Sequence, residues 1–230
     1  MAITPRRMFF NQLLKMPPIK IIVTAGPTIE PMDPVRFISN RSTGYMGYKI
    51  AEAASKRKHA VTLISGPVSL KPPKVKKLIR IETARDLLRA LKTEVKKSDC
   101  LVMCAAVSDF RPVIISRKKI KRTKALSIKL VPNKDLIKEL SLRKKSNLFV
   151  GFSLETENPV VNALKKIKRK KLDIIMANRL SKTHNPFGIN KLDMIMIDAA
   201  GHRLYIKNKS KSYVADVLLD KIEKLWYQKR

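Results

Sequence analysis

The chain has 230 residues and carries 50 lysines and arginines against 18 aspartates and glutamates, which gives a formal net charge of +32. Its hydrophobic content of 44% is too high for a disordered chain, and no apolar run approaches the ~20 residues that cross a bilayer. These totals exclude an integral membrane protein and favour one soluble globular domain.

The positive charge predicts attraction to polyanions such as nucleotides and nucleic acids. However, the lysines are spread along the whole chain, and no basic stretch alternates with aromatic side chains that could stack on bases. We therefore expect no specific nucleic-acid partner and no membrane partner. A basic nucleotide- or nucleic-acid-binding protein remains open as an alternative.

Residues 1–18 precede the first predicted strand, and their short apolar patch is too broken to serve as the core of a signal peptide. We expect a flexible N-terminal extension over 1–18 and a single domain over 19–230. Cys100 and Cys104 share one apolar run, which is typical of buried free thiols in a reducing compartment. The predicted location is cytoplasmic.

The stretch from residue 21 to residue 47 contains three of the seven glycines of the chain. A β-branched run at 21–23 predicts a buried strand, and an amphipathic helix begins near Met46. Glycines at a strand end and a helix start, with Ser and Thr beside them, predict a backbone anion site at the helix N-terminus. The alternative is an ordinary strand-to-helix connection with tight packing.

The rest of the chain alternates buried strands with helices, which is typical of a parallel sheet covered on both faces. We therefore predict an α/β fold, a Rossmann-like and mostly parallel sheet with a C-terminal hairpin and a basic flap over about 111–132. The predicted strands are 59–65, 77–82, 100–107, 126–130, 148–153, 172–177, 194–197 and 204–206. The predicted helices are 83–95, 134–142 with Asn133 as N-cap, 157–171 and 214–225.

Several charged residues fall where such a sheet binds ligands, beyond the carboxyl ends of its strands. Asp109 follows a buried strand, although a turn or capping role would also explain it. Lys166 and Lys170 lie one helical turn apart, so their ammonium groups could converge on one polyphosphate or form a solvated basic face. Lys119 and Lys121 alternate with Ile120 and are expected to point to one side of the flap.

The residue identities in several motifs indicate a family more specifically than the spacing of the glycines does. The motifs TAGPT, DPVR-x-ISN, VTLISGPV, AAV-x-DF, KIKR, GF-x-x-ET and LDIIMAN follow one another from about residue 20 to the C-terminus. In this order they resemble the phosphopantothenoylcysteine synthetase (phosphopantothenate–cysteine ligase) family. A plain NAD(P)-binding reductase lacks support, because the glycine fingerprint is absent.

The resemblance implies a homodimeric ligase of coenzyme A biosynthesis. Its substrates would be 4′-phosphopantothenate, L-cysteine and CTP, with ATP as the nucleotide of eukaryotic members. The carboxylate would attack the α-phosphate to give an acyl-cytidylate and pyrophosphate, and cysteine would then displace CMP to give 4′-phosphopantothenoylcysteine. Mg²⁺ is expected with the nucleotide, its protein ligands are left open, no flavin is expected, and decarboxylation is expected to fall to a separate flavin-dependent protein.

The resemblance also implies roles for single residues. Asn40 would hold the acyl intermediate, Arg36 would support the acidic substrate, and Lys119 would promote turnover from a flap that reaches the site of the partner subunit. The residues implied in nucleotide binding are Gly26, Ser42, Gly44, Ala105, Asp109, Lys119, Asn133, Lys134, Asp135, Leu136, Phe152, Lys166 and Lys170.

The sequence departs from the family pattern at four positions. Tyr45 stands where the family has lysine, Lys134 replaces proline, Arg122 ends the KIKR segment in place of lysine, and Arg179 follows Asn178 in place of aspartate. None of these positions carries a predicted catalytic role. They bear on the nucleotide preference more than on the reaction.

Overall fold

The computed structural model describes residues 17–122, 124–180 and 186–229. Its centre is an eight-stranded sheet in the order β12-β11-β10-β9-β6-β1-β4-β5. The six strands from β10 to β5 run parallel to one another. β11 runs antiparallel to its neighbour β10, and the edge strand β12 runs antiparallel to β11. The strands are β1 (Lys20–Ala25), β4 (Ala60–Ser65), β5 (Lys77–Arg80), β6 (Cys100–Met103), β9 (Leu148–Glu155), β10 (Ile174–Arg179), β11 (Leu192–Asp198) and β12 (Arg203–Lys209).

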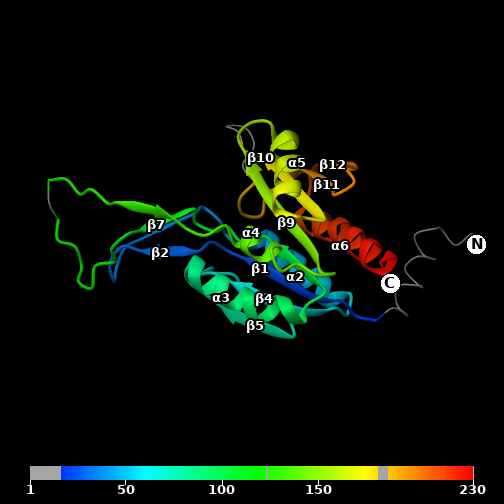
Figure 1. Cartoon of the computed structure of the whole chain (residues 1–230), viewed down its shortest axis with the longest axis horizontal. Helices are drawn as coiled ribbons and strands as arrows, with labels where there is room; N and C mark the ends of the chain where they lie inside the picture. The colour runs from blue at the N-terminus through cyan, green and yellow to red at the C-terminus, as the bar shows by residue number, and fades with distance from the viewer. Residues whose placement is uncertain (1–16, 123, 181–185, 230) are drawn as a thin grey trace, which may run out of the picture.

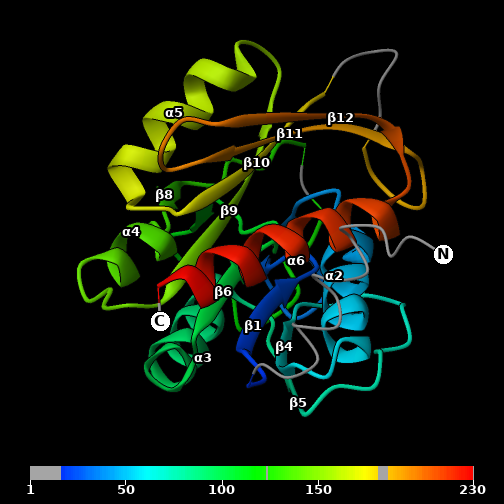
Figure 2. The same ribbon diagram turned by 90° about the vertical axis from the view of Figure 1, so that its right-hand side faces the viewer.

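Helices cover both faces of this sheet (Figures 1 and 2). Successive side chains of a strand point to opposite faces, and in β1 they enter two separate cores: Ile21 and Val23 in one, Ile22 in the other. The first core is covered by α2 (Tyr45–Lys56) and α6 (Lys211–Gln228), and the second by α3 (Ala84–Glu94), α4 (Leu136–Ser141) and α5 (Pro159–Lys170). A short 3-10 helix, η1 (Val95–Lys97), follows α3. The predicted Rossmann-like α/β fold is confirmed, including the C-terminal hairpin.

Two small antiparallel hairpins form an arm that projects from the body of the molecule (Figure 1). They are β2 (Ile29–Pro31) with β3 (Phe37–Ser39), and β7 (Phe110–Pro112) with β8 (Leu130–Pro132). We use "arm" for residues 29–39 and 110–132 without residue 123. The first hairpin was not predicted, because its strands are only three residues long and lie in a polar stretch.

Several predicted boundaries are wrong, most of them by one to three residues, as for the strand predicted over 172–177 and observed at Ile174–Arg179. The strand predicted over 126–130 begins only at Leu130, the first residue of β8, because its partner β7 ends at Pro112 and a single further backbone bond, from the Val113 N–H to the Lys129 carbonyl at 3.0 Å, follows the ladder. The strand predicted over 100–107 ends at Met103, where the next backbone N–H groups turn away to a side chain of β1. α4 is capped by Asp135, whose carboxylate accepts from the N–H of Lys138, and not by Asn133.

Within the described residues no helix is long and apolar enough to cross a membrane. The predicted extension over 1–18 lies outside the described residues, except for Pro17 and Pro18. Its flexibility and the domain boundary at residue 19 stay predictions.

The absence of a side chain at Gly47 allows α2 to pack closely on β1. A Cβ at this position would lie 2.6 Å from Cβ of Ala25 and 3.0 Å from the carbonyl oxygen of Thr24. Both neighbours belong to a central strand and cannot yield easily. Close packing of this helix on this strand places the N-terminus of α2 beside the end of β1.

We predict that Gly47→Ala destabilises the protein although alanine is the better helix former. The propensity gain is about 1 kcal/mol, whereas overpacking a filled core costs about 1–3 kcal/mol. Urea unfolding should show a lower free energy of unfolding, while the exposed control Lys56→Ala in the same helix should change it by less than about 0.5 kcal/mol. A Gly47→Ala protein more stable than the parent would contradict the packing.

Candidate active site

The hydroxyl of Thr24 joins the carboxyl ends of β1 and β6. Its Oγ1 accepts hydrogen bonds from the backbone N–H groups of Cys104 and Ala105, each at 3.1 Å, and donates to the sulfur of Met103 at 3.7 Å. Thr24 is fully buried, so removing its hydroxyl would deprive the half-buried residues Cys104 and Ala105 of this hydrogen-bond acceptor. Ala105, a predicted nucleotide-binding residue, is therefore held at the carboxyl edge of the sheet.

Asn40 meets the same turn from the end of the arm. Its Nδ2 donates to the carbonyl of Ala106 at 3.1 Å, and the N–H of Ala106 donates to the carbonyl of Gly26 at 2.9 Å. The structure thus brings three predicted site residues together: Asn40, Ala105 and Gly26. Since Asn40 is exposed, its oriented amide lies where a ligand at this edge can reach it.

The glycines around this edge pack against one another. Gly26 and Gly44 have φ of +78° and +76°, a region that disfavours other residues, and a Cβ on Gly44 would lie 3.2 Å from Cα of Gly26. A Cβ on Gly66, at the end of β4, would lie 1.8 Å from the carbonyl oxygen of Pro27. Tight packing, the alternative left open by the sequence, accounts for these glycines.

The hydroxyls before α2 bind the backbone of their own loop. Ser42 Oγ accepts from the N–H of Gly44 at 3.3 Å, and Thr43 Oγ1 accepts from the N–H of Tyr45 at 3.4 Å. Two N–H groups of the predicted anion site are therefore already bonded. Nucleotide binding by Ser42 and Gly44 stays a prediction.

Asn133 holds the turn that carries Asp109. Its Nδ2 donates to the carbonyl of Ser108 at 2.9 Å, its N–H donates to the carbonyl of Asp109 at 2.7 Å, and its Oδ1 accepts from Arg111 at 3.1 Å. Both ends of the Asn133 amide are thus used within the protein. Asp109 is exposed, so a ligand at this edge of the sheet can reach its carboxylate.

The two lysines predicted to converge on a polyphosphate bind different carboxylates. Lys166 on α5 donates to Glu155 and, at 3.0 Å, to Ser153 Oγ, both at the end of β9. Lys170 forms an ion pair of 2.9 Å with Asp135, the N-cap of α4.

Burial is the largest single influence on both carboxyl groups and acts to raise each pKa. The lowering interactions together outweigh it: Lys166 and Ser153 act on Glu155, and Lys170 and the Lys138 N–H act on Asp135, so each pKa lies below its ordinary value. Both carboxylates are therefore ionised at neutral pH, and each lysine has a negatively charged partner before any ligand arrives.

Three further predicted residues lie in different environments. Leu136 is buried in the core under α4, so its side chain does not face the edge. Phe152 is half-buried and packs on the α2 and α6 side of the sheet, opposite the face that α5 covers. Lys134 is exposed. A nucleotide that touched both Phe152 and Lys166 would have to cross the end of β9.

Arg36 and Lys119 both belong to the arm. The guanidinium of Arg36 donates to the carboxylate of Asp33 through Nε at 3.0 Å and through Nη2, which also donates to the carbonyl of Ile120 at 2.6 Å. Lys119 is exposed beside this contact. Arg36 is therefore engaged within the arm, and its support of an acidic substrate stays a prediction.

The residues that the sequence reasoning missed lie inside motifs that it used. Thr24 is the first residue of TAGPT, Asp33 is the first residue of DPVR, and Glu155 lies in GF-x-x-ET. The residue types and positions of Thr24, Asp33 and Glu155 were therefore visible in the sequence. What was missing was the partner, since Thr24 binds residues some 80 positions away.

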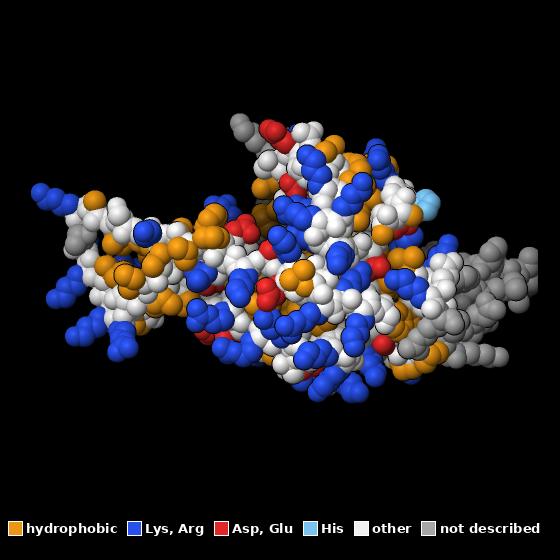
Figure 3. Space-filling view, viewed as in Figure 1, with side chains coloured by type: hydrophobic (Ala, Val, Ile, Leu, Met, Phe, Trp, Pro, Cys, Tyr) orange, Lys and Arg blue, Asp and Glu red, His pale blue; other side chains and the backbone are white. Residues whose placement is uncertain are grey.

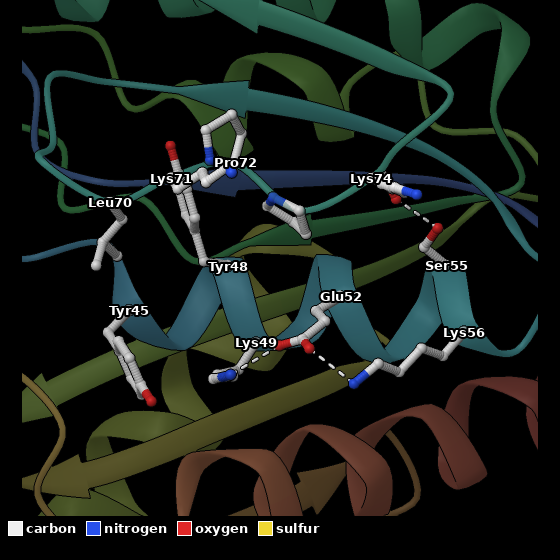
Figure 4. A pocket seen from close by; sticks show the side chains of 11 residues that line it. Tyr45, Tyr48, Lys49, Glu52, Ser55, Lys56, Leu70, Lys71, Pro72 and Lys74 are labelled. Carbon is white, nitrogen blue, oxygen red and sulfur yellow. Dashed lines mark hydrogen bonds and ion pairs between the residues drawn. The ribbon is translucent and has the colours of Figure 1, made fainter.

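A pocket of about 560 Å³ runs along α2 but is not this site (Figure 4). Glu52 bridges Lys49 and Lys56 on its wall, each at 2.7 Å, and Ser55 donates to the carbonyl of Lys74. No predicted site residue lines it. The carboxyl edge of β1 and β6 thus remains the place where Gly26, Asn40 and Ala105 come together.

In the described part of the chain, no group of three or more His, Cys, Asp or Glu side chains is arranged to hold a metal ion. Which residues would hold Mg²⁺ beside a nucleotide stays open, since Mg²⁺ often needs only one or two carboxylates together with phosphate oxygens.

The chain matches, over residues 16–225, the family described as the DNA/pantothenate metabolism flavoprotein C-terminal domain. It belongs to this family. The family that the sequence motifs predicted is confirmed by this match and by relatives that carry the same domain.

Two curated relatives show the extent of the similarity. A cysteine/cysteine sulfinic acid decarboxylase from an unknown prokaryotic organism is 40% identical over 206 residues, 88% of this chain and 57% of the relative. The coenzyme A biosynthesis bifunctional protein CoaBC of Haemophilus influenzae is 38% identical over 223 residues, 96% of this chain and 55% of the relative. The chain thus spans about half the length of the curated relatives it matches.

A solved structure shares the fold across almost the whole chain. The crystal structure of the C-terminal domain of the coenzyme A biosynthesis bifunctional protein CoaBC is 33% identical and superposes with a TM-score of 0.78. The match covers 91% of this chain and 96% of that structure. The fold described above is therefore shared with that domain over most of both chains.

The Cys104 thiol lies at the candidate site, and burial raises its pKa to about 12 from an ordinary value of 9.0. We predict that iodoacetamide at pH 8 labels Cys104 far more slowly in the folded protein than in urea, because its thiolate fraction is lower by roughly 1000-fold. Both cysteines lie on one tryptic peptide, so its fragment ions separate labelling at Cys104 from labelling at Cys100, which serves as the fully buried control. Equal labelling rates in folded and unfolded protein would show that Cys104 is a reactive thiol.

Proposed function

We propose that this chain is a phosphopantothenate–cysteine ligase that joins 4′-phosphopantothenate to L-cysteine in coenzyme A biosynthesis. The observation that carries the proposal is the placement of Asn40 on the 104–106 turn, at the carboxyl edge where this fold class binds ligands. Family membership and relatives named coenzyme A biosynthesis bifunctional protein support the same chemistry.

The proposed reaction has two steps. The substrate carboxylate attacks the α-phosphorus of CTP, a P–O bond forms, and pyrophosphate leaves. The amine of L-cysteine then attacks the carbonyl carbon of the mixed anhydride, an amide bond forms with loss of a proton, and CMP leaves with the oxygen that came from the carboxylate. Asn40 would hold the acyl group, and the Lys119 ammonium would offset charge on the leaving nucleotide.

The first step brings a carboxylate against a polyphosphate, so cations must offset their repulsion. Lys166 and Lys170 are the candidates, provided that a triphosphate, which carries more charge than one carboxylate, displaces Glu155 and Asp135 from them. Mg²⁺ would accompany the nucleotide on its phosphate oxygens. CTP is the proposed nucleotide and ATP the alternative.

We test this function by pyrophosphate release from CTP, and separately from ATP, with Mg²⁺ and 4′-phosphopantothenate, with and without L-cysteine. Release is expected to need phosphopantothenate and to turn over repeatedly only with cysteine. Asn40→Ala and Lys119→Gln should fold normally and lose product formation by at least ~100-fold. Lys118→Gln, an exposed neighbour on the same segment, is the matched control.

No release from either nucleotide would refute the ligase. Tight, salt-sensitive RNA binding by the same protein would then favour the nucleic-acid-binding alternative, which the lysines and arginines spread over the surface keep open (Figure 3).

We also propose that the chain forms a homodimer through its arm. The arm exposes a series of large apolar side chains, and such patches on soluble proteins usually mark interaction surfaces. A self-complementary dimer would bury them without a second protein. The exposed apolar residues of the arm are Val35, Phe37, Phe110, Val113, Ile114, Ile115, Leu126, Ile128 and Leu130.

Sedimentation velocity tests the dimer. The parent protein is expected to sediment as a dimer at micromolar concentration, and the double variant Val113→Glu, Ile114→Glu as a monomer, since charges on the patch would have to be desolvated. Val161→Glu, at a similarly exposed apolar residue on α5, is the control. A parent protein that stays monomeric at every concentration would refute this assembly.

A further inference from the structure

The arm contains a buried carboxylate that gathers donors from two distant segments. The side chain of Asp33, in the turn between β2 and β3, has no exposed surface. Its oxygens accept from the N–H groups of Val35 at 2.8 Å, Arg36 at 2.9 Å and Ile120 at 3.0 Å, and from the Arg36 guanidinium. Ile120 is 87 residues further along the chain.

The same ion pair binds both polar groups of the Ile120 backbone. Asp33 accepts from the N–H, and Arg36 donates to the carbonyl at 2.6 Å. A second contact, from the N–H of Ser116 to the carbonyl of Met32 at 2.9 Å, joins the same two segments. Charge-assisted bonds of this kind are stronger than neutral ones, so the two contacts fasten the segment at two points.

Fixing Ile120 fixes the directions of its neighbours. Ile120 is half-buried, while Lys119 and Lys121 on either side are exposed. The segment from 113 to 122 has no strand or helix of its own to hold it. The peptide bonds of Ile120 are therefore what sets where the two ammonium groups point.

We propose that Asp33 and Arg36 form a latch whose task is to position Lys119 for the reaction. The inference rests on the proposed ligase function and assigns Asp33 as a positioning residue, with no contact of its own to the substrate. It also gives Arg36 a role different from binding the acidic substrate.

The latch is expected to hold over the whole neutral pH range. The hydrogen bonds from Arg36 and from the Ile120 N–H hold the pKa of Asp33 far below its ordinary value, and the guanidinium does not lose its proton in proteins. Both partners stay charged well into the acid range, so pH is not the variable that opens the latch.

The test uses Asp33→Asn in the full chain. The amide keeps one acceptor for the turn but loses the charged oxygen that binds Ile120 and the guanidinium. We expect kcat to fall about 100-fold, the cost of a reacting group misplaced by ~1 Å, with KM for the nucleotide little changed. Hydrogen exchange of the peptide over 113–122 and trypsin cleavage within it should both become faster.

A double variant separates positioning from a general structural role. If Asp33 acts through Lys119, Asp33→Asn combined with Lys119→Gln should be no slower than Lys119→Gln alone. Additive losses would overturn the proposal. Arg89→Gln, which breaks the Asp86–Arg89 pair of the same spacing on α3, is the control and should leave turnover and arm exchange unchanged.

Two further outcomes are distinguishable. If the parent protein releases no pyrophosphate, the ligase function fails, while hydrogen exchange and trypsin cleavage still report whether Asp33 and Arg36 hold the segment. If Asp33→Asn does not fold, Arg36→Gln replaces it, because that variant leaves the carboxylate and its backbone donors in place. Unchanged exchange over 113–122 in the folded variant would refute the latch.

Discussion

The candidate site depends on one buried hydroxyl. Thr24 Oγ1 accepts from the backbone of Cys104 and Ala105 and so joins the ends of two neighbouring parallel strands. β6 stops there because its next N–H groups bond to Thr24 instead of continuing the ladder. The turn formed in this way presents the Ala106 carbonyl to Asn40, so the position of the proposed acyl-binding amide follows from the side chain of a strand residue.

The pairing of individual charged side chains matters more for the candidate site than the large net charge of the chain. A chain of +32 places its rare carboxylates against the lysines and arginines that matter most for the proposed chemistry: Asp33 holds Arg36, Glu155 holds Lys166 and Asp135 holds Lys170. Such pairs orient a long cationic side chain before a ligand arrives. Asp33, Glu155 and Asp135 thus each hold one basic side chain in place until a ligand competes for it.

Most of the fold could be predicted, because buried β-branched runs and helical periods survive in a single sequence. The family motifs also named Asn40 and Ala105 as site residues, and the structure brings both to the carboxyl edge of the sheet. The β2–β3 hairpin and the roles of Asn133 and Asp33 could not be predicted, since short polar strands carry no periodic signal. The side chains of Asn133 and Asp33 bind backbone groups that are remote in sequence, such as the N–H of Ile120 for Asp33. Which of two possible partners an amide or carboxylate takes is decided by tertiary packing.

The central proposal is that the substrate carboxylate is activated by attacking the α-phosphorus of CTP, so that the nucleotidyl group is transferred to it. It is tested most directly with 4′-phosphopantothenate labelled with ¹⁸O in its carboxylate, converted by the protein with CTP, Mg²⁺ and L-cysteine. The account predicts one ¹⁸O atom in the released CMP and none in pyrophosphate, as found by mass spectrometry. Product formation with the label in inorganic phosphate or pyrophosphate would contradict it, because attack would then have occurred at a different phosphorus.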